Sequence, residues 1–283
     1  MWPCKSDQPA EKPQENRHAW VWVLLLASCF QAGCSSVPER FTPSNRINPT
    51  QVTHQIFDDM LQVSVQEGQV NYPALQTDPR FAAYLAQLDR VDPVSLSSER
   101  DRLAFWINAY NAFAIQGILD GYSPRPYLGW YRYFKGREYG IGGQKLNLSD
   151  LEHEILRKQF REPRIHFAIV CASASCPKLL ARAYRGKPLN EQLDAAARVF
   201  VNDLTRNRFD RQARVAYLSK IFDWFEEDFI VAAGSVLGFV SRYVKDPELA
   251  RDLTTVRYRI EYLEYDWSLN GIPPKEGFCV GAP

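Results

Sequence analysis

The stretch Arg164–Pro177, RIHFAIVCASASCP, combines an apolar run with two cysteines. The run Ile165–Cys171 follows a proline and is rich in bulky residues, so it predicts a buried strand. The small residues Ala172–Ser175 then predict a loop whose backbone another group can approach closely. Cys176 stands directly before a proline, a pairing typical of a helix N-cap, where the helix dipole would acidify a thiol. The stretch therefore predicts a strand end, a turn and two sulfurs in one place.

Side chains on a regular strand alternate between two faces. In this run, His166 would point to one face and Cys171 to the other, so the two cannot form a local dyad. If Cys171 or Cys176 has an imidazole partner, His153 is therefore the freer candidate.

The segment Ser97–Gly121 gives the strongest helical signal in the chain. Ser98–Asp101 matches a capping box and Gly121 stands where a C-cap glycine belongs. Apolar or small residues on both flanks predict a helix that is buried nearly all round. Asn108 and Asn111 lie on it, and a buried amide without partners costs about 1–3 kcal/mol. These two amides are therefore expected either to pin the backbone of a neighbouring loop or to line a binding site.

A second helix is expected from Ser149 to about Phe160, after a hairpin over Tyr139–Leu148. Ser149–Glu152 matches a capping box, which would give Glu152 a structural role. His153 follows on the flank that carries the apolar residues of this helix. It therefore points partly inward, where an imidazole needs a partner.

The remaining periodic segments complete an α+β fold, mostly helical. Helices are expected at Val52–Val65, Phe81–Val91, Asn190–Leu204, Phe222–Ile230 and Val236–Val244, and strands at Ala213–Leu218 and Val256–Tyr262. We expect one domain over residues 51–275 around a small β-sheet that includes Ile165–Cys171, and a tail at 276–283.

The N-terminal apolar run Ala19–Gly33 is short for a membrane span and is typical of a signal peptide. Leu26–Cys29 resembles a bacterial lipobox, which predicts a signal peptide at residues 1–28 and a lipid on Cys29. Cys34 is the second choice, because Gln31 stands where the lipobox has an aliphatic residue. Residues 29–50 would then form a lipidated flexible tether. An uncleaved anchor helix is the alternative.

Either interpretation places the domain in the cell envelope, held at a membrane and facing the periplasm. Phe30 is not the Asp associated with inner-membrane retention in lipoproteins of the enteric type, so the outer membrane is expected. In this oxidising compartment, Cys171 and Cys176 could form a disulfide.

The charge composition argues against nucleic acid as a partner. The 283-residue chain has 34 Lys and Arg against 33 Asp and Glu, a net charge of +1 and no basic run, so no nucleic acid is expected. Neither a zinc spacing nor a phosphate-binding glycine loop is present in the sequence, so no metal and no cofactor are expected.

Several motifs, taken in order, resemble the domain-of-unknown-function 547 (DUF547) family. They are Phe105–Asn111, Leu151–His153, Arg164–Ala168, Cys171–Pro177, Leu218–Phe222, Asp228–Phe229 and Tyr265–Trp267. The family has bacterial lipoprotein members and plant members joined to a leucine zipper. The resemblance implies the domain without implying a reaction, because the family has no established activity.

The sequence supports two main functional hypotheses. A binding module of the envelope would hold a protein or a cell-wall ligand through the aromatic segment Tyr122–Phe134, with a structural disulfide. The alternative is a thiol-dependent hydrolase or transferase. Its nucleophile would be Cys176 or Cys171, its base His153 or His166, and its orienting or oxyanion group Glu152 or Asn108. A metal site formed by the same cysteines and histidines is a third option, but their spacing matches no metal-binding motif.

Overall fold

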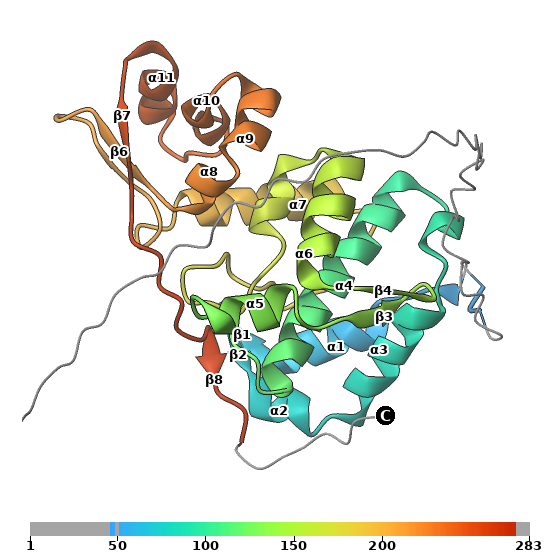
Figure 1. The fold of residues 1–283 in the computed structure, drawn as a ribbon. Helices are drawn as coiled ribbons and strands as arrows, with labels where there is room; N and C mark the ends of the chain where they lie inside the picture. Colours follow the sequence, from blue (N-terminus) through green and yellow to red (C-terminus); the bar gives the residue numbers. More distant parts are fainter. Residues whose placement is uncertain (1–45, 49–50, 276–283) are drawn as a thin grey trace, which may run out of the picture. The chain divides into compact units, whose positions relative to one another are not determined.

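Figure 1 shows a computed structural model, which describes residues 46–48 and 51–275. The chain divides into two units, Met1–Glu39 and Arg40–Pro283, and every described residue lies in the second. The helices are α1 (Gln55–Ser64), α2 (Tyr72–Gln76), α3 (Pro79–Arg90), η2 (Pro93–Ser95), α4 (Glu99–Leu119), α5 (Leu128–Phe134), α6 (Leu148–Asp150), η3 (Leu151–Phe160), η4 (Pro163–Phe167), α7 (Leu189–Val201), α8 (Ile221–Trp224), α9 (Glu226–Ala233), α10 (Val236–Ser241) and α11 (Pro247–Thr255). The strands are β1 (Val65–Gln66), β2 (Gln69–Asn71), β3 (Tyr139–Ile141), β4 (Gln144–Leu146), β5 (Arg208–Asp210), β6 (Val215–Leu218), β7 (Arg259–Tyr262) and β8 (Gly271–Ile272). The fold is α+β, with helices predominating.

Helix α4 is the centre of the larger core. Ser98 caps it by accepting a hydrogen bond from the Asp101 N–H at 3.1 Å, as the capping box predicts. From Leu103 to Leu119 every residue except Gln116 is buried. A helix that is apolar all round has to be covered on every side, and α2, α3 and η3 all pack against α4.

A smaller core lies towards the C-terminal part of the chain. Helices α7–α11 and strands β6 and β7, yellow-orange to red in Figure 1, contribute buried or partly buried residues to it. Buried phenylalanine rings fill its centre, among them Phe167, Phe222, Phe229 and Phe239. Phe167 belongs to η4, so this helix ties the smaller core to the stretch Arg164–Pro177.

The strands form three small sheets, in the orders β1-β2-β8, β3-β4 and β5-β6-β7. Strand β8 pairs parallel with β2, with Gly271 opposite Val70. A Cβ at Gly271 would collide with the Val70 backbone, so this close pairing requires glycine. The hairpin β3–β4 turns through Gly142 and Gly143, as predicted.

The prediction of a strand at Ile165–Cys171 is wrong. Residues Pro163–Phe167 form the 3₁₀ helix η4, which Glu162 caps by accepting from the Arg164 N–H. Ala168 then forms a turn, and the irregular backbone of residues 169–171 belongs to no sheet. The Ala168 carbonyl, the Val170 N–H and the Cys171 N–H bond to side chains, so the apolar run indicated burial and not strand pairing.

Two capping predictions are also wrong. No helix follows Cys176 before α7, so no helix dipole acts on its sulfur. The helix with Glu152 begins earlier than expected, because the Asn147 side chain accepts from the Asp150 N–H at 2.8 Å and takes the capping role. From Leu151 this helix continues as the π-helix η3.

The expected helix Phe222–Ile230 is divided into α8 and α9. The other predicted helices and strands are present with shifted ends.

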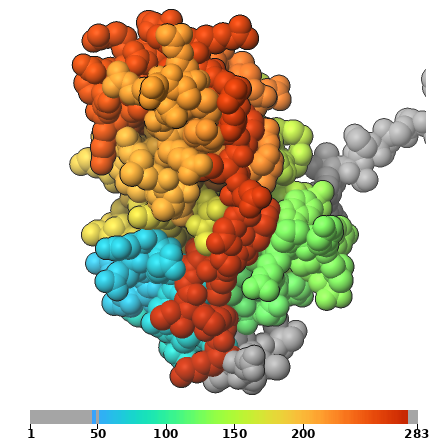
Figure 2. All heavy atoms as spheres, turned by 90° about the vertical axis from the view of Figure 1, so that its left-hand side faces the viewer, coloured from blue at the N-terminus to red at the C-terminus, as the bar shows by residue number. Residues whose placement is uncertain are grey.

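The closing segment, residues 263–270, runs from β7 to β8. Figure 2 shows this red segment descending between the blue and the green parts of the chain. It holds the loop Ala172–Cys176, because the Ala174 N–H donates to the Ser268 carbonyl at 2.7 Å and the Ser175 N–H to that of Asp266 at 3.1 Å. Two segments about ninety residues apart in the chain are thus joined at this loop.

Candidate functional site

A pocket of about 360 Å³ opens beside the loop Ala172–Cys176. One side, here called the first wall, consists of Tyr110, Trp130, Phe134, Ser149, Glu152, His153, His166, Ile169, Cys171, Cys176 and Pro177. The other side, the second wall, consists of Ile221, Trp224, Phe225, Tyr265 and Trp267. The volume of the pocket lies within the range of small-molecule sites.

Glu152 supplies a buried carboxyl group to the first wall. Its side chain accepts a hydrogen bond from the Tyr110 hydroxyl at 3.3 Å, and the residue is 9% exposed. Burial raises the pKa of Glu152 to about 7, although Tyr110 and Arg157 act in the opposite direction. The carboxyl group therefore exchanges its proton near neutral pH, where a general acid or a switchable hydrogen-bond donor operates.

His166 lines the same pocket and is held by Asp228. Its Nε2 lies 2.7 Å from Asp228 Oδ2, and its ring stacks on Phe225 at 3.9 Å between centroids. Burial lowers the pKa of His166, against the effect of Asp228, so the ring is neutral. Nε2–H then donates to Asp228, which leaves Nδ1 as an acceptor. Within residues 46–48 and 51–275 this buried Nδ1 has no hydrogen-bond partner.

Arg157 completes the arrangement around Asp228. Its guanidinium donates to both carboxylate oxygens of Asp228, at 2.7 and 2.8 Å. Burial tends to raise the pKa of Asp228, but the hydrogen bonds from His166 and Arg157 outweigh it and hold that pKa well below its usual range. Asp228 is thus a permanent carboxylate that orients the imidazole of His166.

His153, on the first wall, is half-buried and also bonded to Arg157. Arg157 Nη1 donates to His153 Nδ1 at 3.1 Å. Burial, followed by the charge of Arg157, lowers the pKa of His153. A neutral ring bonded to an arginine is a positioned polar group and a poor base.

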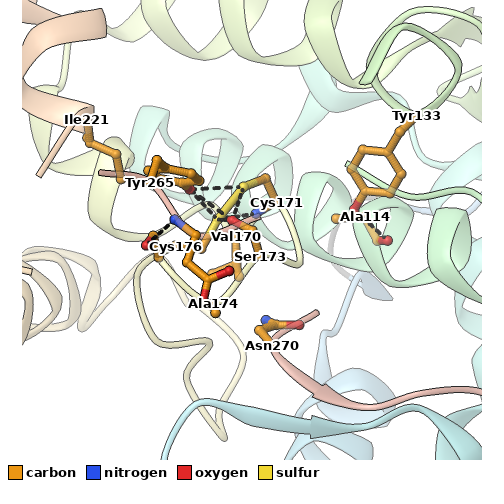
Figure 3. Close-up of a disulfide and its surroundings, with 12 residues drawn as sticks. Ala114, Tyr133, Val170, Cys171, Ser173, Ala174, Cys176, Ile221, Tyr265 and Asn270 are labelled. Carbon is orange, nitrogen blue, oxygen red and sulfur yellow. Dashed lines mark hydrogen bonds between the residues drawn. A yellow bond between two sulfur atoms is a disulfide. The ribbon is translucent and has the colours of Figure 1, made fainter. Parts of the chain in front are cut away.

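Cys171 and Cys176 are joined by a disulfide, with their Cα atoms 6.3 Å apart. Figure 3 shows the hydroxyl groups of Tyr265 and Ser173 beside the two sulfurs. The Cys171 N–H donates to Cys176 Sγ at 3.0 Å. With both sulfurs bonded to each other, neither is a thiolate in this state.

Asn108 and Asn111 do not line the pocket. The Asn111 side chain donates to the Ala168 carbonyl and accepts from the Val170 N–H, both at 2.9 Å. The Asn108 side chain likewise donates to the Tyr184 carbonyl and accepts from the Tyr184 N–H. Of the two expected roles, the structure therefore shows the pinning of neighbouring backbone.

The second wall is mainly aromatic. Trp224, Tyr265 and Trp267 form a cluster with centroids 4.5–5.7 Å apart. Trp224 is 45% exposed, and Trp130 on the first wall is 36% exposed. Seven of the sixteen lining residues are Phe, Tyr or Trp. Flat, exposed rings of this kind provide stacking surfaces for a ligand.

The structure brings together Glu152, His153, His166, Cys171 and Cys176 from the sequence-predicted site. Sequence reasoning missed Asp228 and the whole second wall. Motifs around Asp228 and Tyr265 were noticed, but no spacing relates them to residues sixty or more positions earlier. Cys29 and Cys34 lie outside the described residues.

In the part of the chain that the structure describes, no cluster of His, Cys, Asp and Glu is arranged to hold a metal ion. Among the same residues, no helix combines the length and the apolar character that crossing a membrane requires.

Residues 93–201 match the model of a family described as "Protein of unknown function, DUF547". The span contains α4 to α7 and the whole first wall, whereas the second wall lies beyond it. No curated protein and no solved structure matches the chain.

Proposed function

We propose that this domain binds a glycan ring of the cell envelope in the pocket between the two walls. The observation that carries the proposal is the gathering of seven aromatic side chains around one cavity that Glu152 and His166 also line. Aromatic faces stack on the apolar faces of a sugar ring, and buried polar groups bond to its hydroxyls.

The charges around the pocket favour an uncharged polar ligand. Asp228 is neutralised by Arg157, and both pocket histidines have lowered pKa values that keep them neutral. Glu152 is half-protonated near pH 7. No cation faces the cavity to hold a phosphate or a carboxylate, as far as the described lining residues go.

The test is a calorimetric titration of the full chain with soluble cell-wall disaccharides and N-acetylglucosamine oligomers. Trp130→Ala should weaken binding at least tenfold, because its ring lies at the pocket rim. Tyr131→Ala is the matched control: Tyr131 is the next residue of α5, is 56% exposed and does not line the pocket. Equal affinities of the two variants, or no glycan binding at all, would refute the proposal.

We further propose that a lipid on Cys29 anchors the chain in the envelope, facing the periplasm. The short apolar run and the lipobox-like Leu26–Cys29 support this assignment. Labelled palmitate should enter the expressed chain and be lost in Cys29→Ser but not in Cys34→Ser. The opposite pattern would move the lipid to Cys34, and labelling of neither form would remove the anchor.

A second candidate is hydrolysis of the bound ligand. A carboxyl group that is half-protonated near neutral pH lines the pocket together with His166, whose buried Nδ1 has no partner among the described residues. His166 Nδ1 would take a proton from water while its oxygen attacks, and Glu152 would protonate the leaving oxygen as the C–O bond breaks. Cleavage products that appear with the parent chain and vanish in Glu152→Gln would establish this activity. Binding without cleavage would leave the protein a binding module.

The thiol-dependent alternative needs a free sulfur, and the disulfide removes it. A cysteine nucleophile would exist here only after reduction of the Cys171–Cys176 bond.

A further inference from the structure

The two sulfurs of the Cys171–Cys176 disulfide differ in their surroundings. Both cysteines line the pocket, but Cys171 is partly exposed whereas Cys176 is 3% exposed. A thiolate entering from the pocket would therefore meet the sulfur of Cys171 first. Attack there would make Cys176 the leaving group.

The Ser173 and Tyr265 hydroxyls lie at both sulfurs, 3.2 and 3.4 Å from Cys171 Sγ, but only Cys176 Sγ also accepts from a backbone N–H. The Cys171 N–H lies 3.0 Å from Cys176 Sγ, the Tyr265 hydroxyl 3.3 Å and the Ser173 hydroxyl 3.4 Å. The single Ser173 hydroxyl hydrogen points either to the sulfur or to Tyr265 Oη at 3.0 Å; in the second arrangement Tyr265 donates to the sulfur, and the two hydroxyls form a short relay that ends there. Donors aimed at one atom stabilise a negative charge on it.

Contacts other than the disulfide hold the loop that carries the two cysteines. The closing segment binds its backbone at Ala174 and Ser175, and Arg206 donates to the carbonyls of Cys176 and Ala174 at 2.7–2.9 Å. A cross-link over five positions closes only a short loop, where the entropic gain of a disulfide is smallest. The S–S bond can therefore open while the loop keeps its place.

From the unequal exposure and the donors around Cys176, we propose that Cys171 and Cys176 are a redox-active pair that exchanges with a dithiol entering the pocket. The first thiolate of the dithiol bonds to Cys171 Sγ as the Cys171–Cys176 bond breaks, and the electron pair leaves on Cys176 Sγ. The second thiolate of the dithiol then displaces Cys171, so the dithiol leaves as a disulfide and the protein gains two electrons. This exchange stands independently of glycan binding.

The test places the full chain, without denaturant, in buffers of reduced and oxidised dithiothreitol at pH 7. Acid quenching, alkylation and peptide mapping separate the pair from the other cysteines among the six in the chain. The pair should reduce and reoxidise reversibly while circular dichroism stays unchanged. A disulfide that opens only as the protein unfolds would make it a purely structural cross-link and overturn the proposal.

Two variants test the role of the donors. Tyr265→Phe keeps the ring and removes the hydroxyl, and Ser173→Ala removes the other end of the relay. Each should shift the equilibrium about tenfold towards the disulfide, the size expected for loss of a hydrogen bond to a charged group. Tyr262→Phe, outside the pocket, should leave it unchanged. Unaltered equilibria in both test variants would refute the stabilised thiolate.

The single-cysteine variants identify the attacked sulfur. With oxidised glutathione, Cys176→Ser should form a mixed disulfide at Cys171, whereas Cys171→Ser should react at Cys176 at least tenfold more slowly because that sulfur is buried. Faster reaction at Cys176 would contradict the proposed order of attack.

Discussion

The two walls of the pocket are built differently. The first wall carries the polar groups and the disulfide, and its position is fixed by α4, η3 and the pinned backbone at Ala168–Val170. The second wall supplies rings, and it meets the first through the bonds of Asp228 to His166 and Arg157. The first wall thus supplies the polar groups and three of the seven rings, the second wall supplies the other four rings, and only the first lies in the family-matched span.

The largest effect is expected where the first wall is held to α4. Asn111→Ala would leave the buried Val170 N–H and Ala168 carbonyl without partners, at about 4 kcal/mol in total from the usual cost of each such group. Urea unfolding measures this loss of stability. Asn190→Ala, at an exposed position, is the control and should cost little. A small loss in Asn111→Ala would show that the amide does not hold the wall.

The next largest effect is expected from the buried carboxyl group of Glu152 on the first wall. The pKa of Glu152 rises from 4.5 to about 7 on folding, so the folded protein holds this proton over a pH range in which the unfolded chain has lost it. Stability contributed by that proton is present below pH 4.5 and is lost as the pH rises through 7, by about 3 kcal/mol.

Glu152→Gln cannot titrate, so unfolding measured from pH 4 to 8 should show the parent losing stability relative to this variant. Glu154→Gln, exposed on the same helix, should follow the parent curve. Parallel curves for the parent and Glu152→Gln would mean that Glu152 has an ordinary pKa.

A third prediction tests the connection between the walls. Asp228→Asn removes the charge that pairs with Arg157 and His166, and we expect a loss of about 2 kcal/mol because the pair is partly exposed. Glu227→Gln, the exposed neighbour in α9, is the control. Differential scanning calorimetry should show a lower Tm only for Asp228→Asn. An unchanged Tm would mean that the other contacts between the walls, among them the hydrogen bonds of the closing segment, hold them together without Asp228.

The smallest effect on stability is expected for the second wall. Trp224→Ala removes a ring that is 45% exposed, so its cost should stay below about 1 kcal/mol. Glycan affinity should nevertheless fall, since this ring is part of the stacking surface. Ile230→Ala, 43% exposed on α9, is matched in exposure and should bind as the parent does. Equal binding by both would exclude the second wall from ligand contact.

The sequence predicts the first wall better than the second, for physical reasons. Caps and 3.6-residue periodicity are local signals, and they located α4 and its two buried asparagines correctly. An apolar run indicates burial only, so the same pattern fits a strand as well as η4 and the irregular residues after it. The partner of His166 is Asp228, sixty-two positions later, and no local pattern encodes that contact.

The closing segment has a consequence for how the protein is made. Tyr265 and Trp267 follow every other lining residue in chain order, and Asp266, Ser268 and Asn270 bond to the loop that carries the cysteines. During synthesis on the ribosome, that loop therefore leaves the exit tunnel long before its hydrogen-bond partners do. Until then both thiols are accessible to oxidants and to wrong partners, so correct pairing depends on the last part of the domain arriving in time.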